Sequence, residues 1–591
     1  MSRPAQSHAF VAHDGQRIAY RHWPATGEVS KGAVLLFHRG HEHGGRMAHL
    51  VEELDLPDLA FFAWDARGHG LSDGERGDAP DFATYARDMQ SLVEHIEDQH
   101  GTPVADLLVV AQSVGAVVAT CWLHDYAPPV RGAILAAPAF RVKLYVPLAL
   151  PALRLATRFR DRVFVKSYVR SILLTHDLKR RRGYDSDPLI SRQISARILI
   201  GLRDTSDRLV ADAATIDTPI QLLLSGRDVL VERKVQQRFF ARLPHPDKEC
   251  HRLEGFFHDT LGERDRHLAL APMQRFIRRQ FSRPSQALSR LDADLGGNGC
   301  AEAEALARPL PKSGIKHGYW QLLRKALQQG ARLSNSLKVG VDHGFDSGSM
   351  LDQVYRNRPD SPSRLGRLID RVYLNAIGWR GIRQRRIHLE ALIEQAVREL
   401  RHNGQQVHLV DIAAGHGRYI LSALAALANA SEAPDSVLLR DYSATNVAAG
   451  QALIKEMIPS QPLAQRVRFE AGDAFDRASL ASLTPAPTLA VVSGLYELYP
   501  DNARVRASLS GLAEAMAPGA LLVVTNQPWH PQLSFIARAL SSHRDGEPWV
   551  MRCRSQVEMR QLLAACGFAI VTQRIDPWGI FSVILARRIS P

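Results

Sequence analysis

Two strand–turn–helix signatures, about three hundred residues apart, constrain the fold of this chain more than any other feature. The first spans residues 108–116 (LVVAQSVGA) and the second spans residues 407–417 (VHLVDIAAGHG). In each, an apolar strand-like run ends in a tight turn of small residues before a helix-like run. The first turn presents Ser113, and the second presents glycines after Asp411. This contrast predicts a nucleophile in one half and a nucleotide-like cofactor in the other.

Length and composition are those of a multidomain globular protein. A chain of 591 residues is too long for a single core and predicts about two to four domains. The N-terminal residues lack the apolar segment of a signal peptide, and no apolar run reaches the roughly 18 residues of a membrane span. The five cysteines are scattered without metal-binding spacing. They indicate reduced thiols in a cytoplasmic protein.

The net charge of +13 is concentrated in one segment. Residues 141–183 carry twelve Arg and Lys against two Asp, which accounts for ten of the net charges. Leu, Val and Phe are interleaved with these charges, which favours an amphipathic segment on an anionic membrane over a reader of DNA grooves. A solvated basic helix face is the alternative. A second basic cluster, at residues 380–386, is expected to cover a site or bind an anionic substrate, or else to be an exposed helix face.

Short apolar runs alternate with amphipathic stretches in both halves, which predicts α/β sheets. We expect a first domain at residues 1–281 with a helical insertion at about 141–200, a linker at 282–314, and a second domain at 315–591 that begins with helices. The predicted strands are 33–37, 60–64, 107–111, 132–136 and 220–225 in the first domain, and 407–412, 436–439, 467–470, 488–492, 521–525, 569–575 and 581–586 in the second.

Ser113 lies in Ala-Gln-Ser-Val-Gly, a variant of the Gly-x-Ser-x-Gly elbow that exposes a nucleophilic serine between a strand and a helix. Such a serine needs a histidine base and an orienting acid, in the chain order serine, acid, histidine. Asp228 follows a predicted strand, and His258 lies in a loop before a terminal helix. The loop at residues 38–45 (HRGHEHGG) follows an early strand, where an oxyanion-hole loop is expected.

With these elements, and with WDARGHGLSDG at residues 64–74, the first domain resembles the monoacylglycerol lipase and lysophospholipase group of α/β hydrolases, the serine aminopeptidase S33 type. The resemblance implies an α/β-hydrolase fold with a helical cap. It makes Ser113 the nucleophile, His258 the base and Asp228 the acid that orients the base. The backbone N–H groups of Gly40 and Val114 would form the oxyanion hole.

Two positions depart from this family's pattern. Ala111 and Arg39 stand where the family usually has glycine. Arg39 is expected to narrow the site or to face a phosphate, and an inactive hydrolase scaffold is an alternative to an active enzyme. His41 and His43 fit the oxyanion loop better than a metal site, so we predict no metal.

The second signature suits a nucleotide-like ligand, because small residues let the backbone approach it at a helix N-terminus. NAD-binding proteins carry a similar loop. Acidic or small residues at three later strand ends favour S-adenosyl-L-methionine, and in this order they resemble class I methyltransferases with a Rossmann-like fold. The tail resembles a little-described bacterial methyltransferase family found fused to hydrolases. The cofactor-binding residues implied are Asp411, Ala413, Gly415, Gly417, Asp441 (ribose), Asp473 (adenine), Ala474 and Ser493.

The methyl acceptor is not identified by the sequence. A poorly acidic acceptor needs a base, for which Tyr496, Glu497 and His530 are candidates, with a structural role as the alternative for each. No (Asp/Asn)-Pro-Pro-(Tyr/Phe) motif follows the fourth strand, which disfavours methylation of DNA adenine or of a glutamine amide.

We therefore expect a cytoplasmic enzyme, peripheral at the inner face of the membrane, with two activities. One domain would hydrolyse a lysophospholipid or monoacylglycerol ester, and the other would transfer a methyl group from S-adenosyl-L-methionine. The alternatives are a tailoring esterase and methyltransferase for a soluble metabolite, and a nucleic-acid methyltransferase with an inactive hydrolase scaffold. The expected partners are a lipid or small-molecule ester and an anionic membrane.

Overall fold

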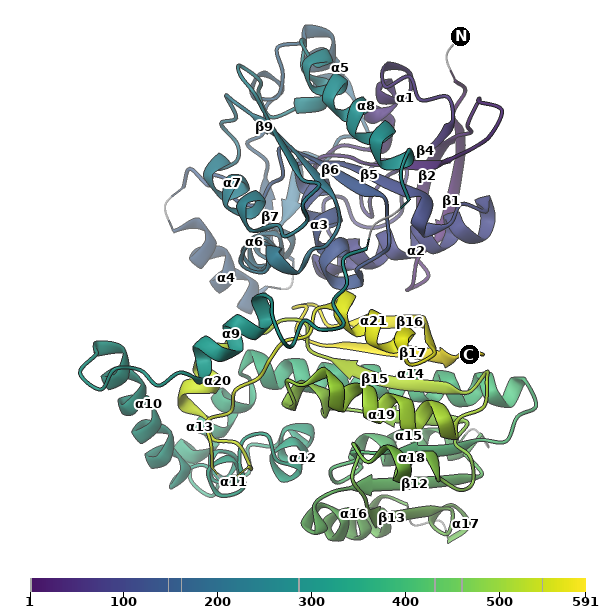
Figure 1. Cartoon of the computed structure of the whole chain (residues 1–591). Coiled ribbons are helices and arrows are strands. Elements are labelled where there is room, and N and C mark those ends of the chain that lie inside the picture. Colours follow the sequence, from purple (N-terminus) through teal and green to yellow (C-terminus); the bar gives the residue numbers. More distant parts are fainter. Residues whose placement is uncertain are drawn as a thin grey trace. The chain divides into compact units, whose positions relative to one another are not determined.

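The computed structural model describes residues 3–146, 148–160, 162–284, 287–429, 432–458, 461–544 and 546–590. The chain divides into two units, Met1–Leu288 and Ser289–Pro591 (Figure 1). Each unit has its own β-sheet and its own hydrophobic cores, so each is described by itself.

An eight-stranded sheet forms the centre of the first unit, with the strand order β1-β2-β4-β3-β5-β6-β9-β10. β2 runs antiparallel to both of its neighbours, and the strands from β4 to β10 pair in parallel. This arrangement is the expected α/β-hydrolase fold. The strands are β1 (Gln6–Val11), β2 (Arg17–Trp23), β3 (Gly32–Phe37), β4 (Leu59–Trp64), β5 (Leu107–Gln112), β6 (Gly132–Ala136), β9 (Ile220–Ser225) and β10 (Glu249–Leu253).

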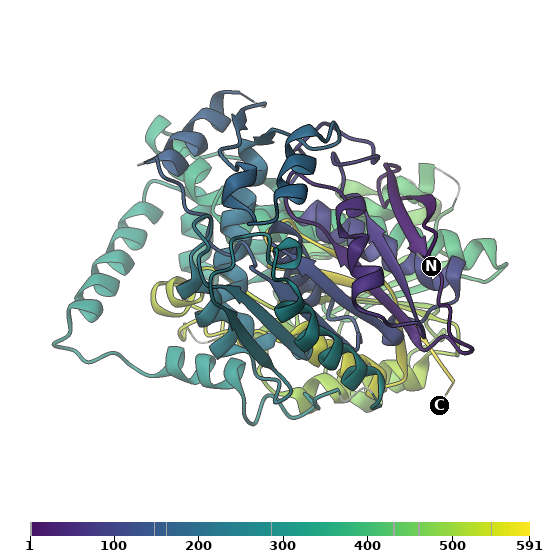
Figure 2. The same cartoon turned by 90° about the horizontal axis from the view of Figure 1, so that it is seen from above.

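The five strands predicted for this unit are confirmed, and they are buried along their whole length. Helices pack on this sheet, and Figure 2 shows the whole chain turned by 90° from the view of Figure 1. α1 and α8 bury apolar side chains against one face of the central strands. The helices are α1 (His49–Glu53), α2 (Ala83–His100), α3 (Val114–Tyr126), α4 (Ala149–Phe159), α5 (Leu178–Ser186), α6 (Ala196–Ala211), α7 (Arg233–Arg242) and α8 (His267–Phe281).

A cap is inserted between β6 and β9. It contains α4, α5 and a two-stranded antiparallel sheet of β7 (Phe164–Lys166) and β8 (Gln193–Ser195), and it leads into α6. None of the residues of α4 is buried, and Leu155 and Phe159 are 56% and 80% exposed. The charged and apolar insertion predicted near residues 141–200 is therefore a structured cap with one uncovered helix.

The second unit contains a seven-stranded sheet with the order β13-β12-β11-β14-β15-β17-β16. β17 is antiparallel to both of its neighbours, and the other pairs are parallel, which gives the expected Rossmann-like methyltransferase fold. All seven predicted strands are present: β11 (His408–Asp411), β12 (Ser436–Asp441), β13 (Val467–Ala471), β14 (Leu489–Val492), β15 (Leu521–Asn526), β16 (Phe568–Ile575) and β17 (Ser582–Arg588).

Two cores lie on opposite faces of this sheet, because successive strand residues point to opposite sides. One includes side chains of α14, α15 and α16, and the other includes side chains of α19 and α21. A third core joins the helices before the sheet to α20. The helices are α9 (Asn298–Ala307), α10 (Ile315–Ala331), α11 (Asn335–His343), α12 (Gly348–Arg356), α13 (Arg364–Leu374), α14 (Ile377–His402), α15 (Arg418–Asn429), α16 (Ala444–Met457), α17 (Gln461–Ala464), α18 (Arg477–Ala481), α19 (Asn502–Ala515), α20 (Leu533–Ala539) and α21 (Gln556–Ala565).

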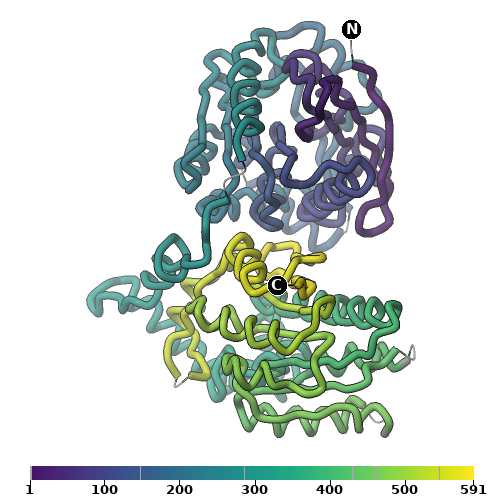
Figure 3. Tube along the Cα trace, turned by 45° about the vertical axis from the view of Figure 1, so that its right-hand side comes forward, coloured from purple at the N-terminus to yellow at the C-terminus, as the bar shows by residue number. Residues whose placement is uncertain are grey.

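The prediction of a linker at residues 282–314 is wrong for most of the residues that the structure describes in this range. Ser289 onward belongs to the second unit, and residues 298–307 form α9. The backbone N–H of Asn502 donates to Asp294 (2.8 Å), and Arg538 donates to the carbonyl of Arg308 (2.6 Å). Figure 3 shows this teal segment beside the yellow tube of the second unit. Its Pro, Gly and Ser residues suggested a flexible connection, but these hydrogen bonds fix it to the sheet-bearing domain.

Among the described residues, no helix has both the length and the apolar character required to cross a membrane.

Candidate active sites

Three side chains that the sequence placed in the hydrolase site meet at one edge of the first sheet. Ser113 follows β5, Asp228 follows β9 and His258 follows β10. Since these strands are parallel, their carboxyl ends lie at the same edge. The Oγ of Ser113 lies 2.7 Å from Nε2 of His258, and Nδ1 of His258 lies 2.7 Å from Oδ2 of Asp228. This is the hydrogen-bonded chain of a serine nucleophile, its base and an orienting carboxylate.

Asp228 is held as a carboxylate. Burial alone would raise its pKa, but His258 and the backbone N–H groups of Leu230 and Val231 lower the pKa of Asp228 below its usual value. An ionised Asp228 accepts a hydrogen bond from the Nδ1–H of His258, which keeps the proton on Nδ1 and leaves Nε2 free to take a proton from Ser113. The geometry therefore sets the tautomer that a general base requires.

Ser113 occupies a strained elbow between β5 and α3. Its φ of 56° and ψ of −117° lie outside the ordinary regions for a residue with a side chain. The turn also needs Gly115, because a Cβ there would lie 2.3 Å from the carbonyl oxygen of His38. Ala111, where the family usually has glycine, is fully buried within β5. Its methyl group is accommodated in the strand, and the elbow forms without the first glycine.

The two predicted oxyanion-hole residues lie beside Ser113. A Cβ built on Gly40 would be 3.0 Å from a methyl carbon of Val114, and all three residues line one cavity. Within the described ranges, no hydrogen bond occupies the backbone N–H of Gly40 or of Val114. His38 supports this loop as a neutral ring, because burial lowers its pKa to about 3. Its Nδ1 donates to the carbonyl of Arg39 (2.6 Å), and its Nε2 accepts from the N–H of Ala66 (3.0 Å).

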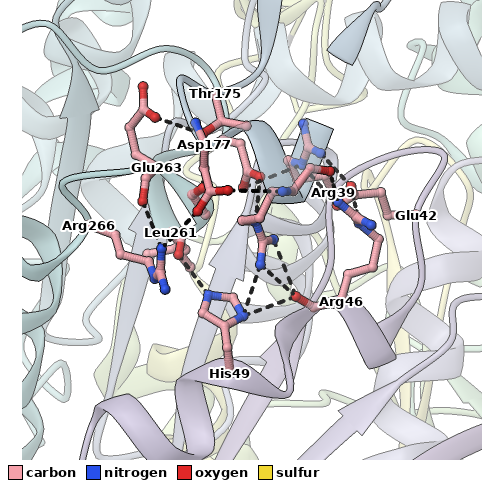
Figure 4. Close-up of polar contacts among 12 residues, drawn as sticks. Arg39, Glu42, Arg46, His49, Thr175, Asp177, Leu261, Glu263 and Arg266 are labelled. Atoms are coloured by element: carbon pink, nitrogen blue, oxygen red, sulfur yellow. Dashed lines mark hydrogen bonds and ion pairs between the residues drawn. The ribbon is translucent and has the colours of Figure 1, made fainter. Parts of the chain in front are cut away.

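Arg39 lines the cavity beside Ser113, as expected for a residue that narrows the site, but its guanidinium is paired with carboxylates and is not left free for a phosphate. Its side chain is 5% exposed, and its guanidinium donates to Glu42 at 3.0 and 2.5 Å (Figure 4). Asp259 lies 3.8 Å away, and Arg46 also donates to Glu42 (2.7 Å). Glu42 and Asp259 thus engage the guanidinium of Arg39 inside the protein, and they share it with Arg46 and Arg180. Arg39 therefore stabilises the conformation of the oxyanion loop through these ion pairs.

The same ionic network fixes the cap to the loop that carries His258. Glu263 accepts hydrogen bonds from the hydroxyl of Thr175 (2.7 Å), and Arg266 contacts Asp177 at 3.4 Å (Figure 4). Arg180, from the basic cap segment, donates to Asp259 at 3.3 Å. Arg180 is thus an internal contact of the cap, and the expectation that it forms part of a membrane-facing surface is wrong.

The cavity beside Ser113 has a volume of about 420 Å³. Its lining is mainly aliphatic and aromatic, and much of it comes from the cap and from α6: Trp64, Tyr85, Val118, Leu144, Val146, Leu153, Val165, Ile198 and Leu202. Sequence analysis missed these residues as pocket lining. Leu153 and Val165 were assigned to a membrane-facing set, and only the fold separates them from the outward-facing Leu155 and Phe159. The cavity suits the hydrocarbon part of an ester.

A second cavity, of about 590 Å³, lies at the carboxyl ends of β11, β12 and β14 in the second unit. Seven of the eight predicted cofactor residues line it: Ala413, Gly415, Gly417, Asp441, Asp473, Ala474 and Ser493. Gly417 has a φ of 77°, which favours glycine, and a Cβ there would lie 2.9 Å from Leu439. At Gly417 the loop therefore lines the cavity with backbone atoms and no side chain.

Asp411 is the exception and requires a correction. It is fully buried, and it lies outside the set of residues that line the cavity. Its carboxyl group accepts from the hydroxyl of Tyr419 and from the N–H of Ala413 (3.1 Å). Burial raises the pKa of Asp411 to about 7. Asp411 therefore fixes the conformation of the glycine loop through these hydrogen bonds and does not line the cavity.

The remaining polar groups fit an adenosine-like ligand. The carboxylate of Asp441 accepts from the N–H of Gly415, the N–H of Ser443 and the side-chain amide of Asn446, each at 2.9 Å. A carboxylate has about four acceptor sites, so Asp441 can still accept from one hydroxyl group of a ligand. Nε2 of His416 and Oγ of Ser493 are buried without a hydrogen-bond partner among the described residues. Because buried polar atoms are normally paired, these two atoms indicate that a polar ligand completes the site.

Residues before the sheet also line this cavity and were missed from the sequence. Ser347, Gly348 and Tyr355 come from the start and the end of α12, and Arg385 comes from α14. The signal available was the small-residue run at residues 344–349 (GFDSGS), which resembles a ligand-binding turn before a helix. Of the expectations for the basic segment at residues 380–386, Arg385 fits the one that it covers a site, because it lines this cavity, and not the one of an exposed helix face. It is buried and paired with Glu497 at 3.0 Å.

Of the three candidate bases, Tyr496 is structural. Its hydroxyl hydrogen-bonds Ser508 at 2.9 Å, and the side chain is buried in the core. Glu497 and His530 instead line a third cavity, next to the second one.

Comparison with known proteins agrees with both units. The sequence model of a family described as "Putative methyltransferase" matches residues 273–588, and that of "Serine aminopeptidase, S33" matches residues 28–265. The protein YnbC of Escherichia coli strain K12, described as uncharacterized, is 51% identical over 588 residues and covers 99% of both chains.

The first unit alone is similar to lipases. A monoacylglycerol lipase of Mycolicibacterium smegmatis is 23% identical over 47% of this chain and 98% of its own length. A human monoglyceride lipase is 27% identical over 42% of this chain and 82% of its own length. The chain therefore belongs to the putative methyltransferase family that includes YnbC of E. coli, with a hydrolase unit of the serine aminopeptidase S33 type preceding the methyltransferase unit.

Proposed function

We propose that the first unit is a serine ester hydrolase that acts on a monoacylglycerol or a lysophospholipid. The observation that carries the proposal is the chain of two 2.7 Å hydrogen bonds from Ser113 through His258 to Asp228, beside an apolar cavity. Two relatives of this unit are named monoacylglycerol lipase and monoglyceride lipase, and these names support a monoacylglycerol-like substrate.

In this mechanism, Oγ of Ser113 attacks the ester carbonyl carbon while Nε2 of His258 takes its proton. Asp228 stabilises the imidazolium that forms. The free N–H groups of Gly40 and Val114 stabilise the negative oxygen of the tetrahedral intermediate. His258 then protonates the leaving alcohol, which leaves an acyl group on Ser113. Water, deprotonated by His258, releases the fatty acid and restores the serine.

The substrate is proposed to enter from an anionic membrane surface through the cap. Tyr145 and Val146 line the cavity and are also 64% and 68% exposed, so the cavity opens next to uncovered apolar side chains. Leu155 and Phe159 of α4 extend this uncovered surface, and Arg158 and Arg160 beside them are exposed. Exposed apolar side chains flanked by cations are typical of helices that lie in a membrane interface.

The second unit is proposed to be an S-adenosyl-L-methionine-dependent methyltransferase. In the cavity at the carboxyl end of β11, Asp441 would accept a hydrogen bond from a ribose hydroxyl, while Gly415 and Gly417 would let the backbone approach the ligand. Asp473 and Ala474 would lie at the adenine, and the cofactor would supply an electrophilic methyl group on a positively charged sulfur. The fusion of the two units is preserved over 99% of YnbC, which supports two activities on one chain.

The hydrolase proposal is tested with Ser113→Ala. We expect this variant to lose ester hydrolysis by about 10⁴-fold or more, together with labelling by a fluorophosphonate. Ser206→Ala is the control, because Ser206 is also buried but its Oγ has no partner and it lies outside the cavity lining. Labelling of Ser113→Ala at wild-type level would show that another residue is the nucleophile.

The cofactor proposal is tested by calorimetric binding of S-adenosyl-L-methionine to the full chain. Asp441→Ala should weaken binding by about 10- to 100-fold, because hydrogen bonds to a charged group contribute about 1.5–3 kcal/mol. Glu470→Ala is the control, because Glu470 lies on the neighbouring strand β13 and outside the cavity lining. Binding of NAD without binding of S-adenosyl-L-methionine would contradict the proposal.

A further inference from the structure

A third cavity, of about 230 Å³, lies beside the proposed cofactor cavity in the second unit. Its walls come from α13, α20, the start of α14 and the segment around Trp549. Arg385, Gly494 and Leu498 line both cavities. A molecule in the third cavity would therefore adjoin a ligand in the second one.

Aromatic and aliphatic side chains form most of the wall of this cavity, including Tyr373, Trp379, Ile536, Trp549 and Phe581. An apolar cavity of roughly 150 Å³ is large enough to hold benzene. A cavity of about 230 Å³ therefore accommodates one aromatic ring with a short substituent. A nucleic-acid base could not enter together with its backbone, and a long acyl chain would not fit.

Polar groups at the same wall lack partners inside the protein. Glu497 and Trp549 are both more than nine-tenths buried. Oε2 of Glu497 and Nε1 of Trp549 nevertheless form no hydrogen bond with the described residues. Buried polar atoms are normally paired, so the missing partners point to a ligand. Few polar groups in a mainly apolar wall are also typical of small-molecule sites.

His530 adds a hydrogen-bond donor of known tautomer. Burial lowers its pKa to about 4, so the ring is neutral at pH 7. Nδ1 accepts a hydrogen bond from the N–H of Gln532 (3.0 Å), so the proton lies on Nε2. Nε2 faces Gly378, another lining residue, because a Cβ built there would lie 2.9 Å from it. His530 can donate to a ligand oxygen, and it is not the base.

Charge selects against an acidic ligand. The guanidinium of Arg385 is already paired with Glu497 at 3.0 Å. Asp346 also lines the cavity and brings a second carboxylate. Burial would raise the pKa of Asp346, but hydrogen bonds with His543 and Ser542 outweigh this effect and lower its pKa below the usual value. Among the described lining residues there is no further Arg or Lys. A carboxylate or phosphate in this cavity would face excess negative charge.

We propose that this cavity binds the methyl acceptor of the second unit, and that the acceptor is a small neutral phenol. This inference rests on the proposed methyltransferase function. Glu497 accepts the phenolic proton on Oε2, and the phenolic oxygen gains the methyl group as the bond from that methyl to sulfur breaks. His530 donates to the acceptor and orients it. A phenol suits a carboxylate base better than an aliphatic alcohol does, because its hydroxyl is more acidic.

The first experiment measures binding to the full chain without any cofactor, by quenching of tryptophan fluorescence and by calorimetry. The probes are 4-ethylphenol, ethylbenzene and 4-ethylbenzoate. We expect 4-ethylphenol to bind about tenfold more tightly than ethylbenzene, which cannot hydrogen-bond to Glu497 or His530. 4-Ethylbenzoate should bind more weakly still. Equal or tighter binding of 4-ethylbenzoate would overturn the neutral phenol.

Ile536→Trp places a large side chain in the cavity and should abolish binding of 4-ethylphenol, while the affinity for S-adenosyl-L-methionine stays within about threefold. Ser534→Trp is the matched control, because Ser534 lies on the same helix, is exposed and does not line the cavity. Melting temperatures of both variants check that they fold. If Ile536→Trp still binds 4-ethylphenol as wild type does, the phenol lies elsewhere and the inference is wrong.

The third experiment tests Glu497 with 4-ethylphenol as acceptor. Glu497→Gln should lower kcat by about 100-fold or more with a KM near that of wild type, because the hydrogen bond to the acceptor remains but the base is lost. A parallel rise in KM with unchanged kcat would reduce Glu497 to a binding role and overturn its assignment as base.

The two proposals fail separately. If S-adenosyl-L-methionine binds and 4-ethylphenol does not, the acceptor inference is overturned and the cofactor proposal stands. If 4-ethylphenol binds in an Ile536-dependent way and S-adenosyl-L-methionine does not, the methyltransferase proposal fails and the role as acceptor falls with it.

Discussion

At the scale of single residues, burial decides what several charged side chains do. Arg39 lines the hydrolase cavity, but its guanidinium is paired with Glu42 and lies 3.8 Å from Asp259. Asp411 lies outside the lining of the second cavity and is hydrogen-bonded to Ala413 and Tyr419, so its expected direct contact with a cofactor is corrected. Both residues therefore lead to predictions on stability.

Arg39→Ala should destabilise the first unit by about 3–5 kcal/mol, because it leaves Glu42 and Asp259 as buried carboxylates with less compensating charge. The measurement is chemical or thermal unfolding followed in this unit. Arg264→Ala is the control, because Arg264 is 67% exposed and pairs only with the exposed Asp265. A loss below 1 kcal/mol for Arg39→Ala would show that the ionic network contributes little to the fold.

Asp411→Asn should remove a pH dependence from the stability of the second unit. The folded state holds the Asp411 proton up to a pKa of about 7. The unfolded chain releases it near a pKa of about 4, so the free energy of unfolding falls as the pH rises between these values, by at most roughly 1.4 kcal/mol per unit. The melting temperature of Asp411→Asn, relative to wild type, should therefore rise from pH 5 to pH 8. A pH-independent difference would contradict the raised pKa.

At the scale of elements, the cap shows how one segment combines two surfaces. α4 leaves Leu155 and Phe159 uncovered, whereas Leu153 of the same helix lines the hydrolase cavity. The 3.6-residue period of a helix places residues two positions apart on different faces. One short helix thus lines the substrate cavity and presents an apolar surface outside it.

The double variant Leu155→Asp and Phe159→Asp should reduce binding to vesicles containing anionic lipid, and with it hydrolysis of monoacylglycerol carried in those vesicles. Hydrolysis of a soluble short-chain ester should stay within about twofold, because neither residue lines the cavity. Leu268→Asp is the control, since Leu268 is 54% exposed on α8. Equal loss on soluble and vesicle-borne substrates would show a disturbed cap instead of lost membrane contact.

At the scale of the whole molecule, the boundary between the two units lies at Leu288, inside the predicted linker at residues 282–314, and the rest of that segment belongs to the second unit. Residues 289–308 contribute hydrogen bonds to α19, α20 and α21: Arg290 to Gln561, Leu291 to Asn502, and Arg308 to Arg538. The second unit is therefore incomplete without this segment.

A fragment of residues 289–591 should fold and bind S-adenosyl-L-methionine with the affinity of the full chain. A fragment of residues 315–591 should be less stable, because it leaves Asn502, Gln561 and Arg538 without these partners. Circular dichroism melting and calorimetry on both fragments give the comparison. Identical melting temperatures of the two fragments would show that residues 289–314 act only as a linker.

Much of the fold could be predicted because its signals are local. Strands covered on both faces read as short apolar runs, and for that reason the central strands β3, β5, β11 and β14 were found. β1, β2 and β10 were missed, because polar and charged residues interrupt their apolar pattern, as in Glu249–Leu253. Turn chemistry likewise identified the elbow at Ser113 and the glycine loop at Gly415 and Gly417.

The sequence by itself determined the two α/β units, the chain order of Ser113, Asp228 and His258, and the loop that borders the cofactor cavity. Only the tertiary structure decided which apolar cap residues face the cavity, which arginines are neutralised inside, and that helices before the second sheet complete its sites. The physical reason is range. Periodicity and turn geometry act between near neighbours, whereas burial and ion pairing depend on residues such as Arg385 and Glu497 that are 112 positions apart.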